Sequence, residues 1–268
     1  MNNKAIILCF SLLLFACNQK ELLFKNPTSQ ETGLNFKNTI TPSNELNILD
    51  YLYYYNGGGV ALGDINNDGL LDIFLSANQE KNKLFINKGN LKFEDITNKA
   101  NVSGNSSWNT GAVMGDINGD GYLDLALTYM GEWWFGQPGA QGSISKFYGA
   151  NTYLLISKGN LQYDVTEIIN NLDNQAQFNV NLFDWDFDGK VDVLPNSMSE
   201  GSYFKNMGNN TFEKKSISPL FSQMIGNKLD YDKDGKLDFV NLYVRQKDEN
   251  GNYNTNNSAQ TLTVTESK

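Results

Sequence analysis

One short acidic pattern occurs four times in the 268-residue chain, and it constrains the fold more than any other feature. Positions one, three, five and nine of each copy carry Asp or Asn, and position six is always Gly. Glycine accepts a positive φ, so the chain can turn tightly there and aim the oxygen-bearing side chains at one point. The four copies span residues 64–72, 116–124, 184–192 and 230–238.

Oxygen-bearing side chains in this register predict a site for a hard cation. Ca²⁺ takes about 6–8 oxygen ligands at about 2.3–2.6 Å. Position seven varies between Leu, Tyr and Lys, which fits a ligand supplied by the backbone carbonyl. We expect up to four Ca²⁺ ions, with ligands from Asp64, Asn66, Asp68, Leu70, Asp72, Asp116, Asn118, Asp120, Tyr122, Asp124, Asp184, Asp186, Asp188, Lys190, Asp192, Asp230, Asp232, Asp234, Lys236 and Asp238.

The residues beside these loops indicate strands and not the helices of an EF-hand. Position twelve, where an EF-hand carries a bidentate Glu, is Leu75, Leu127, Pro195 or Asn241. Positions two, eight and ten are apolar in every copy, within short runs rich in β-branched and aromatic residues. Each loop is therefore predicted to join the two strands of a metal-binding β-hairpin.

A second hairpin follows each of the first three loops. Its turn contains Gly-Asn, at residues 88–90, 158–160 and 207–209. Successive loops begin 52, 68 and 46 residues apart, and two hairpins per repeat give four short strands. Repeats of this kind indicate an all-β chain, a β-propeller with four recognisable blades of four antiparallel strands. Either residues 237–265 and the N-terminal strands close a small ring, or the array is open or incomplete.

The first repeat resembles a known family. The run Gly57-Gly-Gly-Val-Ala-Leu-Gly-Asp-Ile-Asn-Asn-Asp-Gly-Leu-Leu-Asp72, followed by residues 82–90 and 93–97, is similar to the FG-GAP/VCBS repeat. This repeat is the calcium-binding blade of integrin α-subunit propellers and of cartilage acidic protein-like proteins secreted by bacteria. The resemblance implies that Asp or Asn at loop positions one, three, five and nine binds Ca²⁺. Such propellers usually have seven blades, more than this chain shows.

The 68-residue spacing contains an insertion that starts at residue 131. It carries Trp133, Trp134 and Phe135 between Gly and Pro residues, and we single these three out as candidate ligand-binding residues. Adjacent aromatic side chains can stack on a sugar ring or a partner protein. The alternative is that they pack against their own blade.

The N-terminus is predicted to be a lipoprotein signal peptide spanning residues 1–16. Its apolar stretch ends in Leu14-Phe15-Ala16-Cys17, which looks like a bacterial lipobox with Cys17 as the lipidated residue. Residues 17–32 are expected to be the lipidated cysteine and a tether, and residues 33–268 the propeller domain. These segments predict a lipid-anchored protein of the bacterial cell envelope, in the outer membrane and facing the periplasm or the outside.

The composition bears on function mainly by what it lacks. The chain has no histidine, which removes serine triads and His-bound zinc, and its formal charge of −9 argues against nucleic acid as a partner. We therefore expect a non-catalytic adhesion or ligand-binding module whose partner is an extracellular protein or glycan. The alternative is a carbohydrate-binding or carbohydrate-processing envelope component, such as a Ca²⁺-assisted polysaccharide lyase or hydrolase.

Overall fold

The computed structural model describes residues 24–44, 47–49, 54–104, 108–129, 132–135, 144–148, 152–168, 177–197, 202–216, 223–229, 233, 238–243 and 262–265. The predicted signal peptide, Cys17 and most of the fourth loop lie outside this set. For some of these residues, including 132–135, the backbone alone is described. In the described part of the chain, no helix is long and apolar enough to cross a membrane.

The first repeat forms a four-stranded antiparallel sheet whose strands follow one another in chain order. Its strands are β1 (Val60–Gly63), β2 (Asp72–Leu75), β3 (Lys83–Asn87) and β4 (Phe93–Asp95). The first acidic loop joins β1 to β2, as predicted, and the Gly-Asn turn joins β3 to β4. A short helix, α3 (Thr97–Ala100), follows.

The later repeats form three more antiparallel sheets. The second contains β5 (Asn109–Gly115), β6 (Asp124–Tyr129), β9 (Thr152–Ser157) and β10 (Tyr163–Ile168). The third contains β11 (Gln177–Phe183), β12 (Asp192–Ser197), β13 (Ser202–Gly208) and β14 (Thr211–Ser216). The fourth has three described strands, β15 (Gln223–Leu229), β16 (Asp238–Tyr243) and β17 (Leu262–Thr265). The prediction of four-stranded repeats is thus confirmed for three sheets.

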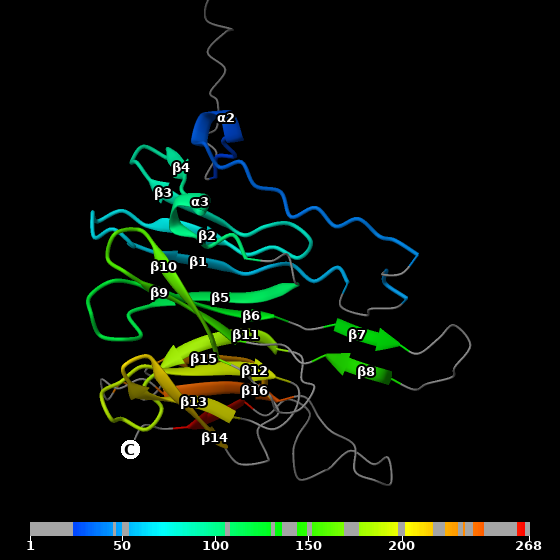
Figure 1. Ribbon diagram of the computed structural model, residues 1–268, viewed down its shortest axis with the longest axis vertical. Coiled ribbons are helices and arrows are strands. Elements are labelled where there is room, and N and C mark those ends of the chain that lie inside the picture. Colours follow the sequence, from blue (N-terminus) through cyan, green and yellow to red (C-terminus); the bar gives the residue numbers. More distant parts are fainter. Residues whose placement is uncertain are drawn as a thin grey trace, which may run out of the picture.

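The insertion of the second repeat forms a hairpin of its own. Strands β7 (Glu132–Phe135) and β8 (Ile144–Tyr148) pair with each other as a separate two-stranded sheet, between β6 and β9 in the chain. Figure 1 shows this hairpin extending away from the stack of larger sheets. The long spacing between the second and third loops therefore reflects an added hairpin and not a fifth strand in the sheet.

Figure 1 shows the first, second and third sheets stacked in chain order, and the fourth sheet packs on the third through β15, which contacts β11 and β12. Strand β6 explains why, because its neighbouring residues point to opposite sides and both sides are apolar. Leu125 and Leu127 are buried with Phe74 and Leu84 of the first sheet. Ala126 is buried instead in a second cluster, with residues of the third sheet such as Phe204. The second sheet can therefore exist only between two others.

The first strands of successive sheets lie beside one another. Strand β1 packs on β5, β5 on β11, and β11 on β15. Neighbouring propeller blades also place their first strands side by side, but the sheets in the described part of the chain do not close a ring. The described sheets therefore form a stack that resembles part of a propeller.

The segment before the first sheet also packs on it. A single helical turn, α2 (Ser29–Thr32), is capped by Thr28, and Lys92 donates a hydrogen bond to the Glu31 carbonyl. The predicted start of the domain at residue 33 falls directly after this turn. Tyr54 lies in a turn before the first sheet and is fully buried.

Candidate metal centre

The first three acidic loops share one backbone geometry. The position-one carboxylate accepts hydrogen bonds from the backbone N–H groups of positions five and six, at 2.7–3.1 Å. In the first loop, Asp64 accepts from Asp68 at 3.0 Å and from Gly69 at 2.7 Å. The position-six glycines have φ of 85°, 87° and 86°, as the sequence predicted. The position-one aspartate thus closes the turn through its hydrogen bonds to the backbone.

Position four also adopts a positive φ, which sequence reasoning missed. Asn67, Gly119 and Phe187 have φ of 57°, 77° and 59°, and Lys233 of the fourth loop has 64°. Asn and Gly are the residues that accept this conformation most readily, and their presence in the first two loops was an available signal. Asn67 also reaches the neighbouring loop, since its Nδ2 donates to the Gly121 carbonyl at 3.2 Å.

The position-nine aspartates of the first three loops are fully buried and have a structural role that sequence reasoning also missed. Asp124 accepts hydrogen bonds from the backbone N–H of Ile117 at 2.9 Å and of Ser157 at 2.7 Å, one on each oxygen. Asp72 and Asp192 accept the equivalent pairs from the corresponding backbone positions. Each oxygen retains a second lone pair, so these hydrogen bonds leave the carboxylate able to act as a metal ligand.

Burial changes the acidity of these carboxyl groups. It raises the pKa of Asp124 from 3.8 to about 6, an effect that the two backbone N–H groups oppose and the nearby Asp120 and Asp116 reinforce. Burial likewise raises the pKa of Asp72 and of Asp192. A cation beside each group would favour the ionised form and so oppose the effect of burial on the pKa.

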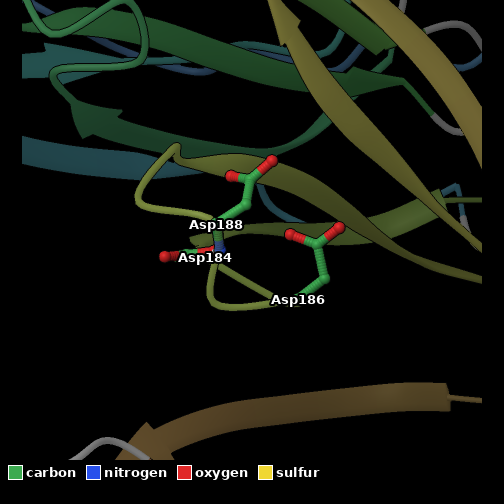
Figure 2. A group of neighbouring side chains, drawn as sticks. All are labelled: Asp184, Asp186 and Asp188. Carbon is green, nitrogen blue, oxygen red and sulfur yellow. The ribbon is translucent and has the colours of Figure 1, made fainter.

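The third loop brings three carboxylates together. Asp184, Asp186 and Asp188 each offer an oxygen, and these oxygens all lie within 4.8 Å of one another. Figure 2 shows the three side chains on the loop between β11 and β12. Two oxygens that bind one Ca²⁺ are separated by at most about 5 Å, twice the metal–oxygen distance, so the cluster fits this ion.

The first two loops place an amide where the third has Asp186. Asn66 donates from Nδ2 to Asp68 at 2.9 Å, and Asn118 donates to Asp120 at 3.0 Å. The side chains of positions three and five therefore converge in these loops as well. Of the fourth loop, Lys233 is described in full and Asp238 by its backbone, so its predicted ligands lie outside the described side chains.

Two lysines contact the acidic cluster of the third loop. The Lys205 ammonium, on β13, forms ion pairs with Asp186 and with Asp188, the latter at 2.9 Å. Lys190 Nζ lies 3.2 Å from Asp188 Oδ2. The hydrogen bond from Lys205 lowers the pKa of Asp188 to about 2, and the two aspartates raise the pKa of Lys205. Sequence reasoning assigned no role to Lys205.

The predicted aromatic site lies on the inserted hairpin. Trp133 and Trp134 are backbone partners of Phe147 and Lys146 across the hairpin, and Phe135 pairs with Ile144 after a register shift. The three residues therefore belong to the separate sheet and to no blade. Their side chains lie outside what the structure describes.

Comparison with known proteins agrees with this architecture. Residues 64–127, which hold the first two loops, match the family of FG-GAP-like repeats. Cartilage acidic protein 1 of Xenopus tropicalis is 34% identical over 104 residues, which cover 38% of this chain and 16% of that protein. The matched part is thus a small share of that relative. A repeat of this family in an all-β stack indicates a ligand-binding or adhesion module that resembles a β-propeller.

One solved structure provides a weaker comparison. It is that of an Agrocybe aegerita lectin and concerns specific recognition of non-reducing terminal N-acetylglucosamine. The match has 18% sequence identity and a TM-score of 0.44, and it covers 67% of this chain and 46% of the lectin.

The raised pKa of Asp124 predicts how stability depends on pH without metal. Because the folded-state value of about 6 lies above 3.8, this group stabilises the fold most when it is protonated, below about pH 4. That contribution is lost as the pH rises through about 6. Urea unfolding in EDTA should therefore give a lower free energy of unfolding at pH 7 than at pH 4.

Asp124→Asn provides the check, because an amide does not ionise. The variant should be less stable at every pH by about 1–3 kcal/mol, since its NH₂ group must face a backbone N–H donor. Its loss of stability between pH 4 and 7 should nevertheless be smaller than that of the wild type. If the variant and the wild type lost the same stability between pH 4 and 7, the carboxyl of Asp124 would not titrate in this range.

Proposed function

We propose that this chain is a lipid-anchored, Ca²⁺-binding ligand-binding or adhesion module of the bacterial cell envelope, without catalytic activity. The observation that supports it best is the convergence of Asp184, Asp186 and Asp188 in a propeller-like array. The match of residues 64–127 to FG-GAP-like repeats supports the binding or adhesion role. Calcium would stabilise the hairpins that carry the loops, and the ligand would bind elsewhere on the array.

The electrostatics of the third loop support the metal. Two like charges 4 Å apart repel by about 1 kcal/mol in water and by about 4 kcal/mol at an effective dielectric constant near 20. Three carboxylates within 4.8 Å experience this repulsion pairwise, and a divalent cation between them converts it to attraction. The first two loops have the same turn with one carboxylate fewer, so we propose that they bind Ca²⁺ in the same way.

Calcium should therefore raise the melting temperature, and EDTA should lower it. One site stabilises the folded state by about 2.7 kcal/mol when free Ca²⁺ is 100 times its dissociation constant. Asp68→Ala should reduce the calcium-dependent increase by the contribution of one loop. Asp164→Ala is the control, because Asp164 forms only an exposed ion pair with Lys158. Equal melting temperatures in EDTA and in millimolar Ca²⁺ would refute the metal-binding proposal.

For the ligand, we propose the inserted hairpin as the binding surface. It forms its own sheet and extends away from the stack, and its strand β7 carries Trp133, Trp134 and Phe135. Rigid aromatic side chains supply a large contact area at a low cost in conformational entropy. The bound partner would be an extracellular protein or a glycan.

An array of glycans and extracellular proteins tests this assignment. Trp133→Ala combined with Trp134→Ala should abolish binding to any partner that the wild type captures, while calcium-dependent melting stays unchanged. Unaltered binding by the double variant would place the ligand site on another surface. Hydrolysis or elimination of an arrayed polysaccharide would contradict the non-catalytic assignment.

The lipid anchor rests on the sequence around Cys17, which lies outside the described residues. Cys17→Ala should abolish incorporation of labelled fatty acid and release the protein into the soluble fraction of cells, because one acylated cysteine is the attachment. The wild type, expressed in parallel, should remain with the membranes in high salt. Membrane association of the variant under the same conditions would refute the anchor.

A further inference from the structure

Strand pairing allows the three complete sheets to be compared residue by residue. In each sheet, one residue of the third strand pairs with the residue that follows the position-nine aspartate. This residue is Phe85 in the first sheet, Leu155 in the second and Phe204 in the third. The following residue is then Ile86 in the first sheet and Ile156 in the second, and both are buried. In the third sheet it is Lys205, whose side chain is 21% exposed.

This lysine coincides with a second change in the same repeat. Position three of the loop is Asn66 in the first repeat and Asn118 in the second, but Asp186 in the third. Lys205 contacts Asp186 and also Asp188. Compared with the first two repeats, the third repeat thus has an additional negative charge on its loop, Asp186. It also has an additional positive charge on a neighbouring strand, Lys205, which contacts Asp186 directly.

We propose that Lys205 is a built-in counter-ion that competes with Ca²⁺ for the third loop. This inference rests on the proposed function, since it concerns the same metal sites. An ammonium bound by two carboxylates satisfies the negative charge that a metal would otherwise bind, and a cation entering the loop must displace it. Without metal, the Lys205 ammonium then occupies the carboxylates of the third loop. The loop therefore binds Ca²⁺ more weakly than its carboxylates alone would.

The position of Lys205 makes displacement feasible. Its ammonium comes from β13 and not from the loop, so it can withdraw without unfolding the turn that Asp184 closes. Its long aliphatic chain remains packed when the charged end moves toward water. Lys190 adds a further positive charge, but it belongs to the loop itself and contacts Asp188 alone.

Terbium luminescence can report on the third loop separately. Tb³⁺ replaces Ca²⁺ at oxygen sites, and a nearby indole excites it. Trp185 occupies position two of the third loop, where the first two loops have Ile65 and Ile117. Excitation at a wavelength absorbed by tryptophan and not by tyrosine, with Trp185→Phe as the blank, identifies the signal of this loop. Competition with Ca²⁺ then gives the calcium affinity.

Lys205→Met should tighten Ca²⁺ binding at the third loop on the order of tenfold, because two partly exposed ion pairs no longer compete. Lys214→Met is the matched control, since it removes one positive charge from β14 of the same sheet, and it should leave the affinity within about twofold. Lys205→Gln should act in the same direction and covers the case in which Lys205→Met does not fold. Circular dichroism establishes folding for each variant.

A melting experiment provides a second measurement. In EDTA, Lys205→Met should melt at a lower temperature than the wild type, and its calcium-dependent increase should be larger. Unchanged calcium affinity in both Lys205 variants, with calcium-dependent melting intact, would overturn the counter-ion role and leave the proposed function standing. Absence of calcium-dependent melting and of Trp185-sensitised terbium emission in the wild type would overturn both.

Discussion

The structure depends above all on a buried carboxylate that ties each of the first three acidic hairpins to the next strand. Asp72, Asp124 and Asp192 are fully buried, and each accepts one backbone hydrogen bond from its own loop and one from the third strand of its sheet. Such a group is costly to bury unless it is hydrogen-bonded on both oxygens. The same atoms therefore determine the path of the loop and its position relative to the sheet.

Burial on both faces makes the sheets depend on one another. Leu125 and Leu127 pack toward the first sheet and Ala126 toward the third. Such a sheet on its own would expose apolar residues on both faces, as in other repeat architectures whose stability comes from contacts between neighbours. The acidic loops and the apolar stacking thus have separate roles, since the loops shape each sheet and the stacking joins the sheets.

Much of this could be predicted from the sequence, because it depends on local patterns. The first three acidic loops each join two paired strands, as predicted, and their position-six glycines have the predicted positive φ. Features that depend on pairing between distant residues could not be predicted from the sequence. The second role of Asp124 needs the N–H of Ser157, and the contacts of Lys205 need the register between β12 and β13.

The hydrogen bonds between neighbouring sheets differ from one pair of sheets to the next. Asn206 donates from Nδ2 to Val191 of its own repeat and, at 2.8 Å, to the Ile117 carbonyl of the preceding one. At the equivalent position of the second repeat, Ser157 Oγ accepts a hydrogen bond from the backbone N–H of Gly159, and the first and second sheets are linked by the bond from Asn67 to Gly121. The repeats are therefore not interchangeable, because exchanging two of them would separate donors from their acceptors.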